Sequence, residues 1–160
     1  MNKFYTGVGA RKTPTYILEL MTDIAQCLYQ QGYVLRSGGA EGADRAFELG
    51  AGNLKEIYLA KHATKEAMEI ASKFHRAWHK CSQFAKALHG RNAFQVLGHS
   101  LGHPSEFLIC WTPDGCNSHL NRDWITGGTG TAISIAWANG VPILNLCRPE
   151  IRQQWINWVK

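Results

Sequence analysis

The clearest structural signal in the chain is Ile125-Thr-Gly-Gly-Thr-Gly-Thr-Ala-Ile-Ser-Ile-Ala-Trp-Ala-Asn-Gly-Val-Pro-Ile-Leu-Asn-Leu146. A glycine-rich turn comes first, apolar residues at helical spacing follow, and an apolar run after Asn139-Gly140 predicts a buried strand. A glycine run that opens a helix directs backbone N–H groups at an anion, and the helix dipole favours negative charge there. We interpret the turn as a phosphate site; the alternative is an ordinary turn before a core helix.

A second stretch repeats this arrangement. Tyr33-Val-Leu-Arg-Ser-Gly-Gly-Ala-Glu-Gly-Ala-Asp44 predicts a strand, a glycine turn and the start of a helix. Two such turns in one chain indicate two loops at the same edge of a parallel sheet. Open α/β sheets bind ligands at that edge, beyond the carboxyl ends of the strands.

The remaining sequence extends the alternation of strands and helices. Strands are predicted at 4–7, 33–37, 56–60, 106–111 and 141–146. Helices are predicted from Pro14 to Gly32, over 41–49, from Thr64 to Trp78, over 80–89, after a break at Gly90 over 91–97, and over 151–158. The pattern predicts one domain, 1–160, with a Rossmann-like α/β fold: a largely parallel sheet of about five strands flanked by helices.

Composition sets broad limits on the class of protein. The 160 residues are 45% hydrophobic and 18% charged, which suits one folded domain. No apolar run has the length of a membrane span, and the first residues lack the apolar core of a signal peptide. We therefore expect a soluble, cytoplasmic protein with no membrane partner. Five irregularly spaced cysteines do not predict a disulfide framework.

The charge balance favours an anionic ligand. Lys and Arg number 17 against 12 Asp and Glu, a formal charge of +5, which suits a nucleotide or a nucleic acid without choosing between them. Many of the basic residues and histidines lie in a predicted helical segment at 61–98. This segment is interpreted as a lid, a partner surface or a solvated helical layer, and the solvated layer is favoured.

Three motifs occur in an order that resembles a known superfamily. They are Thr6-Gly-Val-Gly-Ala-Arg11, Ser37-Gly-Gly-Ala-Glu-Gly-Ala-Asp44 and Gly127-Gly-Thr-Gly-Thr131. Together they resemble the SLOG superfamily of DprA-like and LOG-like Rossmann proteins, over residues 4–146. Arg91-Asn92 is similar to an Arg-Asn pair of DprA proteins. The resemblance implies a pocket for nucleotides or nucleic-acid phosphates, lined by Gly7, Gly9, Arg11, Ser37, Gly38, Gly39, Arg91, Gly127, Gly128, Thr129, Gly130 and Thr131. Asp44, Asn92 and Trp111 are further candidate ligand-binding residues.

The chain departs from the enzymes of this group at one position. LOG-type phosphoribohydrolases carry a catalytic Glu where this chain has Ser134. We therefore predict no catalytic residue and no cofactor, and expect binding of a nucleotide or ADP-ribose-derived ligand without turnover. The chain is similar to small stand-alone phage-type members, which implies sequestration of a defence signal by a homo-oligomer. The alternatives are a DprA-like mediator that binds single-stranded DNA and a LOG-like N-glycosidic hydrolase, for which Glu41 and Glu106 are the acids near predicted sheet edges.

Several candidate residues have two interpretations. Arg11 follows a strand and a glycine turn, where a guanidinium binds phosphate bidentately. Asp44 either binds a ribose hydroxyl or caps its own helix, and the cap is favoured. Trp111 either stacks on a base or belongs to the core. The residues His75, His79 and Cys81, like Cys110, Cys116 and His119, lack zinc-finger spacing, so no metal site is predicted.

Overall fold

The computed structural model describes residues 2–160, and its centre is a five-stranded parallel sheet. The strand order is β3-β2-β1-β4-β5, and every neighbouring pair is parallel. The predicted Rossmann-like α/β class is therefore confirmed. The strands are β1 (Lys3–Gly7), β2 (Tyr33–Ser37), β3 (Lys55–Ile57), β4 (Leu108–Cys110) and β5 (Ile143–Asn145).

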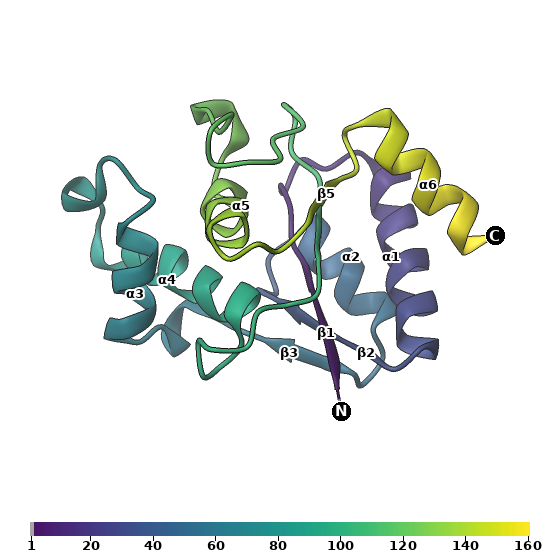
Figure 1. The fold of residues 1–160 in the computed structure, drawn as a ribbon, viewed down its shortest axis with the longest axis horizontal. Coiled ribbons are helices and arrows are strands. Elements are labelled where there is room, and N and C mark those ends of the chain that lie inside the picture. The colour runs from purple at the N-terminus through teal and green to yellow at the C-terminus, as the bar shows by residue number, and fades with distance from the viewer. Residues whose placement is uncertain (1) are drawn as a thin grey trace.

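Helices cover both faces of the sheet (Figure 1). One face carries α1 (Thr15–Gln30), α2 (Ala43–Gly50) and α6 (Pro149–Val159). The other face carries α3 (Lys65–Ser72), α4 (Gln83–Leu97) and α5 (Thr129–Ala138). Three short 3-10 helices, η1 (Ala60–His62), η2 (Trp78–Lys80) and η3 (Trp124–Thr126), lie in the connections.

Each face has its own apolar core. On the first face, α1 presents Ile17, Met21 and Ile24, whose helical spacing puts them on one side against β1 and α2. On the second face, Ile133 and Ile135 of α5 pack with Leu108 and Cys110 of β4 and with Val96 of α4. Helix α5 is buried almost all round over Gly130–Ala136, which explains its nearly uninterrupted apolar sequence.

The strand order reverses beside β1, where α/β folds commonly bind ligands. The first crossovers lead from β1 outward to β2 and β3, whereas the chain returns through α3 and α4 to place β4 on the other side of β1. The loops after β1 and β4 therefore lie side by side. Their backbones are joined by a hydrogen bond from Ala10 N to Trp111 O of 3.2 Å.

The middle of the chain differs from the sequence prediction in three places. The strand predicted at 56–60 ends at Ile57, and the helix predicted up to Trp78 ends at Ser72. The predicted break at Gly90 is wrong, because α4 runs through it without interruption. A Cβ at Gly90 would stand 2.6 Å from Met68 Cγ, so glycine is needed there for close packing of α4 on α3 rather than to end a helix.

Within residues 2–160, no helix has the length and hydropathy needed to cross a membrane.

Candidate functional site

The first two glycine turns pack against each other. A Cβ at Gly9 would stand 2.6 Å from the Ala43 Cβ and 3.1 Å from the Trp111 carbonyl oxygen. A Cβ at Gly42 would stand 2.7 Å from Arg11 Cα. At the end of β1, a Cβ on Gly7 would stand 2.7 Å from the Phe47 ring. The packing of the protein itself therefore accounts for these glycines.

Buried polar groups hold the second turn in place. The Asp44 side chain is 4% exposed, and its Oδ2 accepts a hydrogen bond of 3.3 Å from Ala40 N. Arg91 of α4 donates a 2.8 Å hydrogen bond to Gly38 O. A Cβ on Gly38 would meet both side chains, at 2.9 Å from Asp44 Oδ2 and 2.9 Å from Arg91 Cζ. Asp44 therefore holds the turn before α2. The favoured interpretation of Asp44 as a helix cap is not what the described residues show, since the N-cap position of α2 is Gly42 and no side chain caps that helix end.

Burial controls the ionisation of this cluster. Desolvation raises the pKa of Asp44 to about 6, although the Ala40 N–H and the charge of Arg91 oppose that change. Desolvation also lowers the pKa of Arg91, and the charge of Asp44 opposes it. Each group thus contacts the second turn through a hydrogen bond, and the charge of each favours the ionised form of the other.

The other predicted residues near these turns have varied surroundings. Arg11 is exposed, and Gly39 is an exposed glycine with a φ of +70°. Ser37 is buried and donates to Gly7 O, while Asn92 is buried within α4. Trp111 is half-buried and packs on the core of the first sheet face. The nearby Arg36 is buried beside Glu56, with 3.7 Å between Arg36 Nε and Glu56 Oε1.

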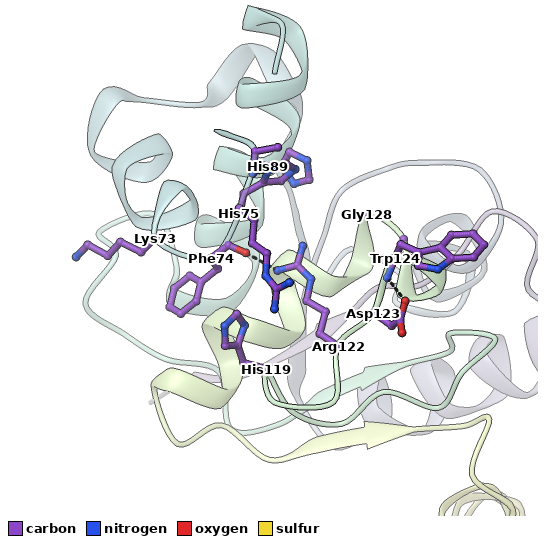
Figure 2. Close-up of a pocket in the computed structure, with 12 residues that line it drawn as sticks. Lys73, Phe74, His75, His89, His119, Arg122, Asp123, Trp124 and Gly128 are labelled. Carbon is purple, nitrogen blue, oxygen red and sulfur yellow. Dashed lines mark hydrogen bonds between the residues drawn. The ribbon is translucent and has the colours of Figure 1, made fainter. Parts of the chain in front are cut away.

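The third glycine turn opens into a large cavity on the second sheet face. The cavity has a volume of about 850 Å³, within the range typical of small-molecule sites. It lies between the turn that starts α5 and the segment joining α3 to α4, with His75 and His89 on one side, Trp124 and Asp123 on the other and Arg122 between them (Figure 2). Its lining is Lys73, Phe74, His75, Arg76, Ala77, His89, His119, Arg122, Asp123, Trp124, Gly127 and Gly128.

Arg122 is the central cation of this cavity. Its Nη1 donates to Phe74 O at 2.8 Å and to Ser134 Oγ at 3.0 Å, and its Nη2 donates to Thr131 Oγ1 at 3.2 Å. All these acceptors are neutral, and within residues 2–160 no carboxylate forms an ion pair with Arg122. Its pKa is lowered by burial. A half-buried guanidinium without a carboxylate is a favourable partner for an anionic ligand.

The hydroxyls of α5 position this arginine. Ser134 is fully buried, and its Oγ lies 2.7 Å from His119 Nδ1 and 3.0 Å from Arg122 Nη1. Thr131 lies 2.8 Å from His89 Nδ1. Gly130 leaves the space for Arg122 itself, since a Cβ there would come into contact with Arg122 Nε. Burial first, and the charges of His75, Arg122 and Arg91 next, lower the pKa of His89 to about 4, so its imidazole is neutral at pH 7.

Gly127 and Gly128 differ from every glycine of the first two turns. No atom of the described chain lies within 4 Å of the position that a Cβ would take at either residue, apart from the adjoining residues. Gly127 has a φ of +76°, which favours glycine. Gly128 has a φ of −62° and a ψ of −26°, values that any residue adopts. Neither packing nor backbone conformation within residues 2–160 requires a glycine at 128.

The start of α5 is electrostatically unneutralised. Over the described residues, no side chain caps this helix end and its first turn holds no acidic residue. The nearest acid in the lining, Asp123, is exposed, and its carboxylate accepts from Trp124 N and caps η3. The partial positive charge of the helix end therefore faces a cavity that Arg122, Lys73 and Arg76 also line.

Sequence reasoning found the turn of this site but not its side chains. The polar loop before η3 lacks periodicity and supplies His119 and Arg122. Trp124 is the first residue of η3. The available signal was the clustering of Arg122, Asp123 and Trp124 just before the glycine run. Among residues 2–160, none of those that line the cavity belongs to the first two glycine turns. Comparisons with protein-family models, with curated proteins and with solved structures find no match to this chain.

Proposed function

We propose that the protein binds a nucleotide or ADP-ribose-derived ligand in the 850 Å³ cavity, with a phosphate at the start of α5. Gly128 carries the proposal. A glycine that the protein does not need for its own packing leaves room for a ligand to approach the backbone N–H groups of the helix end. Arg122 lies beside this position without a carboxylate partner within the described residues and supplies a charge-assisted donor.

Other residues that line the cavity suit the base and the further phosphates of a nucleotide. Trp124 is 86% exposed at the edge of the cavity, where an aromatic face is available to a base. Lys73 and Arg76 add positive charge for further phosphates. The resemblance to SLOG proteins supports the same ligand class. Ser134 supplies no acid at the position of the LOG-type Glu, which favours ligand capture over turnover.

Native mass spectrometry of protein purified from a nucleotide-rich lysate tests this proposal. Wild type, Arg122→Ala and Arg11→Ala are compared after a thermal melt has established that each is folded. We expect a retained phosphate-bearing ligand in wild type and Arg11→Ala and its loss in Arg122→Ala, because Arg11 is not among the cavity-lining residues. Loss in Arg11→Ala with retention in Arg122→Ala would place the ligand at the first two turns instead and refute the cavity assignment.

A single-stranded nucleic acid is the second candidate ligand. The exposed Trp124 beside Lys73 and Arg76 favours it, because single strands bind by base stacking next to basic side chains. Stacking contributes about 1–3 kcal/mol for each base, and phosphate contacts make affinity fall steeply with salt. Fluorescence anisotropy with a short oligonucleotide at two salt concentrations, in wild type and Trp124→Ala, tests it. Salt-independent or absent binding eliminates this candidate.

A further inference from the structure

A cluster of three potential metal ligands lies at the side of the same cavity. His75, Cys81 and His89 each offer one ligand atom, and the three atoms lie within 4.8 Å of one another. Cys81 Sγ is 3.7 Å from His75 Nε2, and the two imidazole rings have centroids 4.7 Å apart. Figure 2 shows both histidines on the same side of the cavity. All three residues are half-buried.

The fold gathers these residues from separate places. His75 lies in the irregular segment after α3, Cys81 follows η2, and His89 lies in the middle of α4. His79 lies between His75 and Cys81 in the sequence, but residues 73–77 are not helical and His79 is exposed outside the cluster. The site therefore depends on the turn that leads from α3 into α4.

The distance between the sulfur of Cys81 and the imidazole of His75 fits a tetrahedral metal. Zinc–sulfur and zinc–nitrogen bonds of about 2.3 Å and 2.0–2.1 Å at tetrahedral angles separate sulfur and nitrogen by about 3.6 Å. The observed 3.7 Å between Cys81 Sγ and His75 Nε2 is close to that value. His89 Nδ1 lies 2.8 Å from Thr131 Oγ1, a contact that would fix the orientation of the imidazole, as hydrogen bonds to metal-bound histidines do. His75 Nδ1 accepts a 3.2 Å hydrogen bond from Ala77 N. A metal on Nε2 would leave the imidazole proton on Nδ1, so this hydrogen bond would be lost on metal binding.

We propose that His75, Cys81 and His89 bind a divalent transition metal ion of the zinc type, with the fourth coordination position open to the cavity. Imidazole and thiolate select zinc and its neighbours, whereas magnesium and calcium prefer oxygen ligands. Two of the ligands line the cavity, so the open position would accept water or a ligand oxygen there.

Cobalt substitution tests the site without the cavity ligand. Protein freed of metal by a chelator is titrated with Co²⁺ and then with Zn²⁺, and thiolate-to-cobalt absorption is recorded. We expect one Co²⁺ per chain, a thiolate charge-transfer band and displacement by one Zn²⁺. Cys81→Ser should remove the band. His89→Ala should weaken Zn²⁺ binding by more than about 10–100-fold, the loss caused by removing a residue that only hydrogen-bonds to a ligand.

Matched variants separate the site from nonspecific binding. His79→Ala and Cys147→Ser remove a histidine and a cysteine outside the cluster and should leave the band and affinity unchanged. The proposal is overturned if wild type shows no thiolate band at micromolar cobalt, or if the band persists in Cys81→Ser. Because the metal alone is the probe, failure here leaves the phosphate proposal standing, and failure of phosphate binding leaves this one standing.

Discussion

Replacing Gly128 with alanine separates a ligand role from a structural role for this residue. At a φ of −62° and a ψ of −26°, alanine fits the backbone, and within residues 2–160 a Cβ meets nothing beyond the adjoining residues within 4 Å. Restricting the unfolded chain should then stabilise the protein by about 0.4–1 kcal/mol. For a chain of this size the melting temperature should rise by about 1–4 °C.

The same methyl group should damage ligand binding. It occupies the space through which a phosphate approaches the start of α5 and would displace at least one charge-assisted hydrogen bond. Such a bond contributes about 1.5–3 kcal/mol, which corresponds to a loss of affinity of about 10- to 150-fold. Isothermal titration with ADP and ADP-ribose, together with a thermal melt, measures both effects.

A matched control is available in the same chain. Gly102 is exposed, and the nearest atom to a Cβ there is Ser100 Oγ at 3.9 Å, so Gly102→Ala should change neither affinity nor fold. If Gly128→Ala binds the ligand as tightly as wild type, no phosphate lies at this helix end. If Gly128→Ala unfolds many degrees below wild type, packing requires glycine at this position, which would contradict the open space around a Cβ at residue 128.

Three further predictions concern packing, ionisation and turnover. Gly50→Ala should destabilise the protein by about 1–3 kcal/mol in denaturant unfolding, because its Cβ would clash with the Thr22 carbonyl of α1; an unchanged midpoint would contradict the close α1–α2 packing. The pKa of Asp44 is raised from 3.8 to about 6, so folding favours its protonated form. The stability that this protonated carboxyl adds to the fold is fully present below pH 3.8 and is lost as the pH rises through 6. Relative to Asp44→Asn, wild type should therefore lose about 3 kcal/mol of stability between pH 4 and 7, at about 1.4 kcal/mol for each pH unit; parallel pH profiles would contradict the burial of an ionisable carboxyl. No base or ribose phosphate should be released from AMP or ADP-ribose over hours in a chromatographic assay; steady release that Asp123→Asn abolishes would show that the exposed Asp123 carboxylate of the cavity is catalytic.

The parallel sheet and most helices follow from local pattern, whereas the structure of the middle of the chain does not. Alternating strand and helix signals around two glycine turns predicted a parallel sheet, because parallel strands need crossovers. Gly90 predicted a break since glycine is a poor helix former. Its contact with Met68 depends on how α3 packs against α4, which no local signal contains.

The sequence predicted the glycine turn of the candidate site but not the side chains around it, for a similar reason. A glycine needed for packing, such as Gly9, and one beside open space, such as Gly128, look the same in sequence. Arg122 gains its role only when the loop before η3 comes beside the Phe74 carbonyl, 48 positions away. The metal cluster arises likewise, since the turn between α3 and α4 brings Cys81 to His75 and leaves His79 outside.

Backbone amide shifts during titration with ADP-ribose test the central claim most directly. Two-dimensional ¹H–¹⁵N NMR spectra of the labelled protein report each turn separately. We predict saturable shifts of Gly128, Thr129 and the Arg122 Nε–H, with little change at Gly9 and Gly38. Shifts confined to Gly9, Gly38 and their neighbours, or no saturable shift at Gly128, would contradict phosphate binding at the start of α5.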